Sequence, residues 1–279
     1  MSDTTAPLVS YAPNGEDIVL WRALRHLTPG FFVDVGACDP VVTSITKLFS
    51  LRGWRGINVE PLPHLVEMLE HDRPDDINLR LALSDTEGEL TLYVVADDMQ
   101  RTTLSEPLAN LYRAEGYHIV EQPTPVRTLG AVLTEHPLPR IDFLKIDAEG
   151  MEDAIVRGLD LSTHRPLVIV AEEGSHQRYE FPQLLTAAGY RETLWDGLNR
   201  FFASPDADDD LCDKLSYPAG VHDGYVHIDL VDALEEARAA HRRAAELDAH
   251  IAEIHRSSTW RVGAALHAPV RFARRWTSR

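Results

Sequence analysis

Short apolar runs alternate with helical patterns along most of this chain of 279 residues. Continuous apolar runs of strand length are typical of buried parallel strands, and apolar residues three and four apart are typical of amphipathic helices. The expected core strands are 31–36, 56–61, 77–84, 142–147 and 166–173. The expected helices are 16–27, 45–53, 65–72, 128–136, 151–159 and 181–190. This alternation predicts an open, doubly wound α/β domain with a mostly parallel sheet.

Two further segments predict additional strands. Residues 89–95 alternate between apolar and polar side chains and fit an extra edge strand. Later in the chain, Asp196-Gly197 is a strong signal for a two-residue hairpin turn. We therefore expect two antiparallel strands around this turn to complete one edge of the sheet.

The charge of the chain is unevenly distributed. Lys and Arg number 27 against 44 Asp and Glu, which gives a net charge of −17. Residues 256–279 contain six Arg and no acidic residue, so the rest of the chain is more acidic still. Nucleic-acid binding needs surplus Lys and Arg to neutralise phosphates, so we expect no nucleic-acid partner for this acidic body.

Cysteine content and hydropathy indicate the compartment. The two cysteines, Cys38 and Cys212, are too few for a disulfide framework and fit a reducing environment. The first residues lack the basic start and apolar stretch of a secretory signal. No apolar run approaches the roughly 20 residues that span a bilayer. These features lead us to expect a cytoplasmic protein.

A change in composition near residue 229 predicts three parts: an α/β domain at 1–228, a helical arm at 229–255 and a basic tail at 256–279. In the arm, mostly apolar residues keep 4-3 spacing from Leu230 to Ala244, and again from Leu247 to Ile254. This spacing fits either a short coiled coil that forms a homo-oligomer or a helix packed on its own domain. The tail mixes Arg with aromatic and aliphatic residues, which fits a peripheral membrane or protein contact, or packing on the acidic body.

In a sheet of this kind, ligands bind beyond the carboxyl ends of the strands. The loop after the first strand holds Asp34, Gly36 and Ala37. Gly36 permits a tight turn close to a ligand, and Asp34 can accept hydrogen bonds from a cationic or amino-bearing ligand. Glu60 ends the next strand, where an acid can accept both hydroxyls of a ribose, and Ser84 ends the third, near a potential adenine edge. The same residues also fit a turn glycine and a capping carboxylate.

The loop after the first strand favours one nucleoside cofactor over another. A nicotinamide-binding loop needs G-x-G-x-x-G to admit a pyrophosphate, whereas this loop has only Gly36 and is closed by Pro40. S-adenosylmethionine carries no phosphate and has a cationic sulfonium and ammonium, so an acidic loop attracts it. S-adenosylmethionine is therefore the expected cofactor, and a nicotinamide-dependent oxidoreductase is the less favoured alternative.

Six segments carry a family resemblance: GEDIVLWRAL at 15–24, FFVDVGACDP at 31–40, RGWRGINVEPLPHL at 52–65, VRTL at 126–129, IDFLKIDAEGMEDAIVRGLD at 141–160 and DGLNRFF at 196–202. They resemble FkbM-type methyltransferases, a family of S-adenosylmethionine-dependent O-methyltransferases. The resemblance implies a Rossmann-like class I methyltransferase fold with strand order 3-2-1-4-5-7-6. It also implies that sugar or polyketide-like hydroxyls are the acceptors. The implied site residues are Asp34, Gly36, Ala37 and Glu60 for the cofactor and Asp147, Glu149 and Gly150 in a D-x-E-G signature.

Methyl transfer to a hydroxyl needs help with the hydroxyl proton, because an alcohol is a weak acid. One route is a general base. Asp147 and Glu149 follow the fourth core strand and His176 follows the fifth, so these are the candidate catalytic residues, with Asp147 also near the cofactor. His176 equally fits an ordinary surface position. Asp196 and Asn199 in the hairpin could also reach the acceptor, and Asp196 equally fits a turn residue.

The other route is a divalent cation that binds the acceptor oxygen as a Lewis acid. Asp147, Glu172 and Glu173 follow neighbouring strands and so fall at the same edge of the sheet. Hard oxygen ligands suit Mg²⁺, which makes these three a candidate metal site. The alternative is that Asp147 and Glu149 brace the following helix, whose first turn is acidic.

The leading hypothesis is an O-methyltransferase acting on a hydroxyl of a sugar, polysaccharide or glycosylated natural product. The polar segment 97–105 fits a lid that binds the acceptor, although ordinary solvated loops have the same composition. The alternative from another class is a non-catalytic protein of methyltransferase fold that binds or scaffolds partners.

Overall fold

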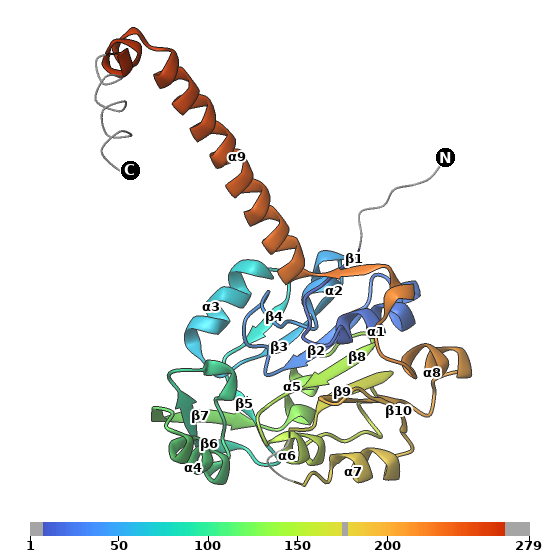
Figure 1. Cartoon of the computed structure of the whole chain (residues 1–279). Coiled ribbons are helices and arrows are strands. Elements are labelled where there is room, and N and C mark those ends of the chain that lie inside the picture. The colour runs from blue at the N-terminus through green and yellow to red at the C-terminus, as the bar shows by residue number, and fades with distance from the viewer. Residues whose placement is uncertain (1–7, 175–177, 266–279) are drawn as a thin grey trace, which may run out of the picture. The chain divides into compact units, whose positions relative to one another are not determined.

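The structure, a computed structural model, describes residues 8–174 and 178–265. It separates into two compact units, residues 1–227 and residues 228–279, which we describe one at a time. Figure 1 shows an α/β domain in the first unit and a long helix in the second. The boundary between the units adjoins the change of composition near residue 229.

A seven-stranded sheet forms the centre of the first unit, in the order β10-β11-β9-β8-β2-β3-β4 (Figure 1). Its strands are β2 Phe31–Val35, β3 Arg55–Val59, β4 Ile77–Leu79, β8 Phe143–Ile146, β9 Val168–Glu172, β10 Arg191–Trp195 and β11 Asn199–Ala203. β2 pairs in parallel with β3 and β8, whereas β11 is antiparallel to β9 and β10. Numbered within the sheet, this is the expected order 3-2-1-4-5-7-6. The Rossmann-like class I methyltransferase fold with an antiparallel edge is therefore confirmed.

Helices cover both faces of this sheet, because successive residues of a strand point to opposite sides. Phe32 faces the side covered by α1 (Glu16–Leu24), α2 (Lys47–Leu51) and α8 (Asp209–Leu215). Val33 faces the side covered by α5 (Leu129–Glu135), α6 (Glu152–Arg157) and α7 (Phe181–Ala187). α3 (Pro63–Asp72) contacts β4. These layers leave the carboxyl ends of the parallel strands as the edge where loops gather.

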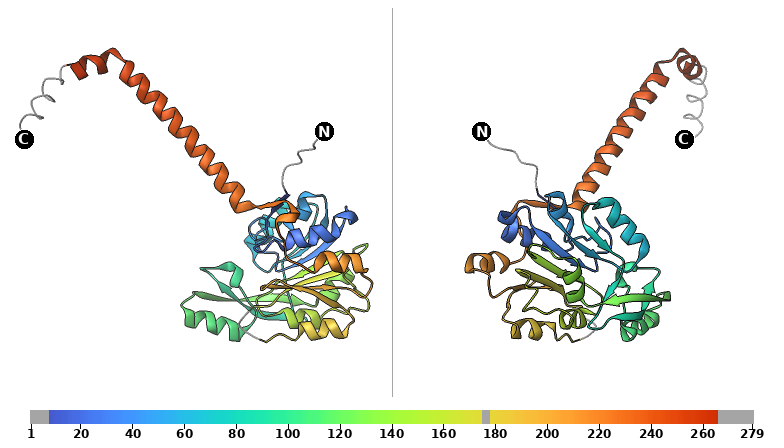
Figure 2. Two further views of the ribbon diagram at one scale, coloured as in Figure 1. Left: turned by 45° about the vertical axis from the view of Figure 1, so that its right-hand side comes forward. Right: turned by 180° about the vertical axis from the view of Figure 1, so that it is seen from behind.

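A second, three-stranded sheet in the order β5-β7-β6 corrects two strand predictions (Figure 2). The predicted strand 77–84 is divided between β4 in the main sheet and β5 (Ala82–Leu83) in this one. Segment 89–95 lies in β6 (Gly88–Val95), which is not an edge strand of the main sheet. β6 pairs with β7 (Ile119–Arg127), and α4 (Glu106–Glu115) connects them. Alternating polarity predicts a half-buried strand, but it does not identify the sheet that the strand joins.

The hairpin of β10 and β11 forms at the predicted place, although three residues, 196–198, connect its strands instead of two. Asp196 Oδ1 accepts hydrogen bonds from Leu198 N at 2.9 Å and Asn199 N at 2.7 Å, so Asp196 serves as the turn residue. A short parallel pair, β1 (Leu8–Ser10) and β12 (Tyr225–His227), was not predicted.

The second unit contains α9 (Ile228–Arg256), a continuous helix of 29 residues. None of its residues is buried, and Leu234, Leu247 and Ile251 are 49%, 63% and 48% exposed. The predicted 4-3 spacing therefore lies on one uninterrupted helix. In the described part of the chain, no helix is long and apolar enough to cross a membrane.

Candidate active site

A cleft at the carboxyl edge of the main sheet encloses about 1220 Å³, its open mouth included. The loops after β2 and β3 contribute Gly36 and Glu60 to its wall, and the ends of β8 and β9 contribute Asp147 and Glu172. Residues 99–100 and 102–104 also line the cleft, so part of the segment predicted as an acceptor lid belongs to its wall. Residues distant in sequence meet here because parallel strands end at a common edge.

The loop after β2 requires glycine at position 36. Gly36 has φ +69°, a left-handed conformation, and a Cβ atom placed on it would lie 1.7 Å from the backbone oxygen of Asp147. Gly36 N and Ala37 N donate to the Val59 carbonyl at 3.0 and 3.1 Å. The glycine therefore lets the β2 loop approach both the β3 end and the β8 end.

Glu60 fastens two loops around the cleft. Its Oε2 accepts from Cys38 N at 3.0 Å, and its Oε1 accepts from Leu62 N at 2.9 Å. The side chain lines the cleft and is 5% exposed, and burial raises the pKa of its carboxyl to about 7. Each carboxylate oxygen can accept a further hydrogen bond, which is what a ribose diol would supply.

Lys145 is a buried cation that the sequence analysis missed. Its Nζ donates to the Gly36 carbonyl at 2.6 Å and lies 3.2 Å from Asp34 Oδ1 and 3.5 Å from Asp147 Oδ2. Asp34 is 1% exposed, and its Oδ2 accepts from Thr46 Oγ1 at 2.5 Å. Asp34 thus braces the β2 loop through Lys145. A lysine within the apolar run 142–147 is the sequence signal that could have revealed Lys145 as a buried cation.

Arg73 is a second buried cation that the sequence did not reveal. It is 3% exposed and follows α3. Its Nη1 donates to Thr46 Oγ1 at 2.7 Å, and its Nη2 donates to the Pro40 carbonyl and to Ser44 Oγ, both at 2.8 Å. These bonds hold the segment between β2 and α2, whose residues Ser44 and Ile45 line the cleft.

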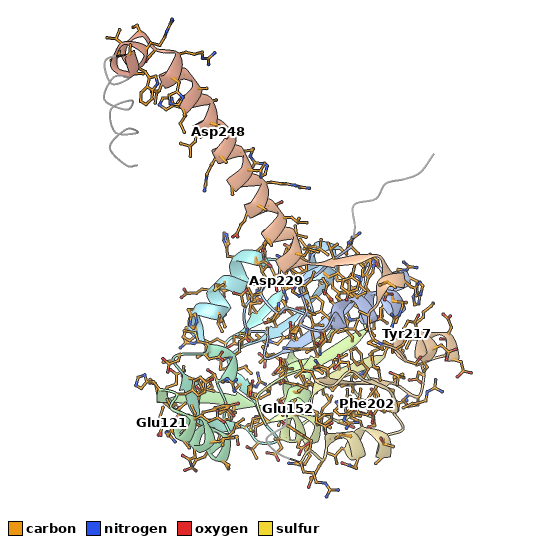
Figure 3. All side chains as sticks on the ribbon, in the orientation of Figure 1. Glu121, Glu152, Phe202, Tyr217, Asp229 and Asp248 are labelled. Atoms are coloured by element: carbon orange, nitrogen blue, oxygen red, sulfur yellow. The ribbon has the colours of Figure 1, made fainter. Side chains whose placement is uncertain are left out.

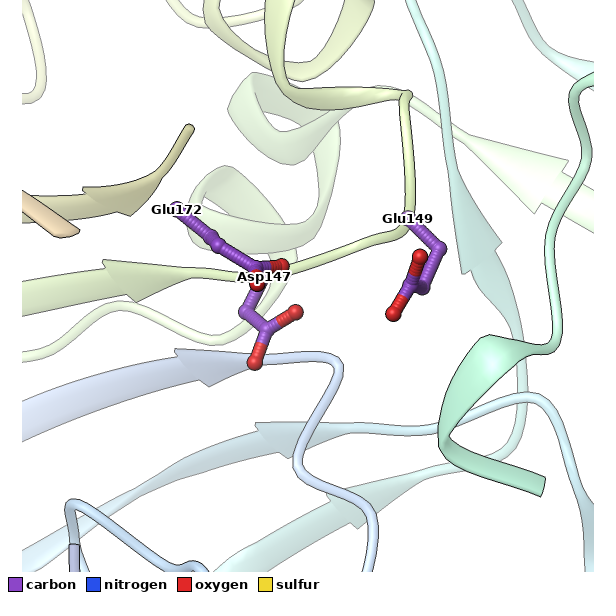
Figure 4. A group of neighbouring side chains, drawn as sticks. All are labelled: Asp147, Glu149 and Glu172. Carbon is purple, nitrogen blue, oxygen red and sulfur yellow. The ribbon is translucent and has the colours of Figure 1, made fainter. Parts of the chain in front are cut away.

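Three carboxylates gather at the ends of β8 and β9 (Figure 4). Asp147, Glu149 and Glu172 each place one oxygen within 4.8 Å of the others. Glu149 has φ +46°, an unusual conformation for its residue type, and its Oε2 accepts from Tyr112 OH at 3.0 Å. Burial raises the pKa of Glu149 to about 7, and burial together with the neighbouring Asp147 carboxylate raises the pKa of Glu172 well above its usual range.

Residues 34–192 match the family described as the Methyltransferase FkbM domain. The chain belongs to the FkbM methyltransferase family. The matched residues include Gly36, Glu60, Asp147 and Glu172 of the cleft wall, whereas Glu16 and Asn199 of the same wall lie outside the match. No curated protein matches the chain.

The chain is similar to three solved structures, each at low identity and with a low TM-score. An FkbM methyltransferase from Methylobacillus flagellatus KT is 16% identical with a TM-score of 0.36, and the match covers 62% of this chain and 43% of that one. A TehB-like SAM-dependent methyltransferase from Corynebacterium glutamicum ATCC 13032 Kitasato is 14% identical (TM-score 0.33; 68% and 87% covered). An O-methyltransferase from Bacillus cereus, in complex with SAH, is 12% identical (TM-score 0.35; 71% and 84% covered).

Two predicted site residues of this FkbM domain lie elsewhere: Ser84 is not in the cleft wall, and Glu173 is not in the carboxylate cluster. Ser84 does not line the cleft, whose wall there is formed by Leu81–Leu83, and its Oγ bonds instead to Asp85 at 3.4 Å. Glu173 pairs with Arg200 instead of joining the carboxylate cluster. Successive strand residues point to opposite sides, so Glu172 and Glu173 diverge although they are adjacent.

Glu152 is the first residue of α6 (Figure 3). It has the helix-bracing role that was considered for Asp147 and Glu149. Its Oε1 accepts from Ala148 N at 2.8 Å and Gly150 N at 3.3 Å, at the start of α6. Burial raises the pKa of Glu152 to about 8. Asp147 and Glu149 are therefore not needed to satisfy these backbone groups of the FkbM domain.

The remaining candidates come from the loop after β9 and from the hairpin. His176 lies outside the described residues. Asn199 lines the cleft, and its Nδ2 donates to Glu16 Oε1 at 2.8 Å, whereas Asp196 is occupied by the turn. The structure thus brings one of the two hairpin candidates to the site.

Proposed function

We propose that this chain is an S-adenosylmethionine-dependent O-methyltransferase acting on a hydroxyl of a sugar, polysaccharide or glycosylated natural product. The observation that carries the proposal is a single cleft with Gly36 and Glu60 at one end and the carboxylates Asp147 and Glu172 at the other. The first end fits a nucleoside and the second fits a hydroxyl that must lose a proton.

In this proposal, residues of the chain bind S-adenosylmethionine and remove the proton from the acceptor hydroxyl. S-adenosylmethionine supplies a methyl group on a cationic sulfur: the oxygen–carbon bond forms as the carbon–sulfur bond breaks. Glu60 and the Gly36–Ala37 turn hold the nucleoside end, and the acidic cleft attracts the positive charge. Asp147, with its side chain 39% exposed, or Glu149 takes the hydroxyl proton. His176 remains a further candidate base.

Binding of S-adenosylhomocysteine, measured by titration calorimetry, tests the cofactor assignment. Replacing Glu60 by Ala should weaken this affinity about 10- to 100-fold, because a hydrogen bond to a charged group contributes about 1.5–3 kcal/mol. Glu60→Gln keeps one carbonyl oxygen and should lose less, and Glu67→Ala on the exposed face of α3 is the matched control. Unchanged affinity in Glu60→Ala would contradict the ribose role.

We also propose Mg²⁺ as a cofactor, with one change to the ligand set. Asp147, Glu149 and Glu172 offer three hard oxygens in one group, whereas Glu173 is engaged by Arg200. A divalent ion bound there would lower the pKa of the acceptor hydroxyl. We expect methyl transfer to fall at least tenfold in EDTA and to return with added Mg²⁺. Full activity in EDTA would contradict the Mg²⁺ proposal. The three carboxylates would then remain only as candidate bases.

A separate proposal concerns partners: α9 forms a homo-oligomer, and the basic tail contacts an anionic membrane surface or a protein. The support is the 4-3 spacing on a helix of 29 residues without a buried side chain. Truncation after Ile228 should lower the oligomeric state measured by light scattering in solution. An unchanged mass for the truncated chain would eliminate oligomerisation through α9.

A further inference from the structure

The acceptor end of the cleft contains a polar residue that the proposed mechanism does not use. Asn199 begins β11 and stands directly opposite Glu172 of β9 in the antiparallel ladder. Opposed residues of such a pair project to the same face of the sheet. Both line the cleft, and both lie across β8 from the β2 and β3 loops that form the cofactor end. Asn199 is therefore placed beside the carboxylates and away from the nucleoside end.

Asn199 is held in one orientation. Its Nδ2 donates to Glu16 Oε1 at 2.8 Å, and Glu16 Oε2 accepts from Asn14 N at 2.9 Å. Its backbone N is fixed by Asp196 in the turn. Because the Asn199 carboxamide donates its nitrogen to Glu16, the Oδ1 atom of Asn199 points away from Glu16.

Among the described residues, no side chain or backbone group donates a hydrogen bond to Asn199 Oδ1. This oxygen is not among the fully buried side-chain atoms that lack a partner, so the small exposed part of Asn199 leaves it open to the cleft that the residue lines. An acceptor oxygen in a cleft wall that no protein group occupies is available to a hydrogen-bond donor on a ligand, and such polar groups fix how a ligand lies in its pocket. A carbonyl oxygen recognises a hydroxyl hydrogen, and the neighbouring carboxylates recognise a second one. Two acceptors side by side match two adjacent hydroxyls.

We propose that Asn199 binds the hydroxyl next to the one that is methylated, so that the acceptor is a vicinal diol, with Glu16 as the residue that positions Asn199. This inference rests on the proposed O-methyltransferase function and specifies its acceptor. It predicts that a glycoside stripped of the neighbouring hydroxyl is a poor acceptor even when the reacting hydroxyl is present.

The test uses the full-length protein, labelled S-adenosylmethionine, and a panel of methyl glycosides with their monodeoxy counterparts. The wild type should prefer the diol by at least tenfold in kcat/KM. Asn199→Ala should lower kcat/KM on the diol about 10- to 100-fold, the effect of one buried hydrogen bond, and should erase the preference. Its affinity for S-adenosylhomocysteine should stay within about twofold, as should that of the surface control Asn110→Ala.

A double substitution that exchanges the two side-chain types distinguishes loss of the diol contact from misfolding. The double substitution Glu16→Gln, Asn199→Asp reverses the hydrogen bond while keeping an oxygen toward the cleft, so it should retain the diol preference that Asn199→Ala loses. A preference that survives Asn199→Ala, or a wild type with equal kcat/KM on the diol and on its monodeoxy counterparts, would overturn the diol proposal alone. Failure of the wild type to bind S-adenosylhomocysteine would overturn the proposed function as well.

Discussion

Replacing Gly36 by alanine should destabilise the domain by about 2–5 kcal/mol and abolish binding of S-adenosylhomocysteine. The added Cβ would lie 1.7 Å from the Asp147 carbonyl oxygen, which is backbone and cannot rotate away. The residue would also have to adopt φ +69°. Relief therefore requires the β2 loop and the β8 end to separate, which opens the cofactor end of the cleft. Urea unfolding and calorimetry measure the two effects.

Gly53 provides the matched control. It also has a left-handed backbone, with φ +83°, but nothing lies within 4 Å of the place where its Cβ would be. Gly53→Ala should therefore show only the conformational cost, about 1–2 kcal/mol, and should bind S-adenosylhomocysteine normally. Equal destabilisation by both substitutions would show that backbone conformation, and not the close approach to Asp147, makes Gly36 necessary.

Replacing Lys145 by methionine should cost about 3–5 kcal/mol, the usual effect of removing one partner from a buried ionic group. The Lys145 ammonium lies 3.2 Å from Asp34 Oδ1 and 3.5 Å from Asp147 Oδ2, and it also binds the Gly36 carbonyl. Methionine leaves Asp147 without this cation and leaves Asp34 only its longer ion pair with Arg73, whose Nη1 lies 3.9 Å from Asp34 Oδ2. Affinity for S-adenosylhomocysteine should fall too, because the cofactor loop loses its tether. The free energy of unfolding and calorimetric affinity test both expectations.

Acidic buffer should partly rescue the Lys145→Met variant, because protonating one stranded carboxylate removes its uncompensated charge. The stability difference from the wild type should therefore be smaller at pH 5 than at pH 8. The control is Lys214→Met, which removes an exposed pair with Asp210 and should cost less than about 1 kcal/mol. A Lys145→Met defect as small as that of Lys214→Met would contradict the bracing role.

Much of the fold follows from local pattern. Four of the predicted apolar runs form the strands β2, β3, β8 and β9. The strand order implied by the family resemblance is also the order observed in the sheet. The failures lie in residues 77–127, where β5, β6 and β7 form a separate sheet. Alternation in β6 marks a half-buried strand, but pairing with β7 is a long-range choice that polarity alone does not encode.

Within the site, the sequence by itself determined which loops would line the cleft, because parallel strands must end at one edge and a loop follows each end. Gly36 and Glu60 were found in this way. Only the tertiary structure decided which side chains meet there. It placed Glu149 instead of Glu173 beside Asp147 and Glu172.

Tertiary packing likewise brought together residues that are distant in the chain. Lys145 contacts Gly36 of the cofactor loop, 109 residues away, and Asn199 contacts Glu16, 183 residues away. The physical reason is that periodicity assigns a residue to a face of its own element. Contacts between elements depend on strand order, on alternating side-chain direction and on the need of each buried polar atom for a partner.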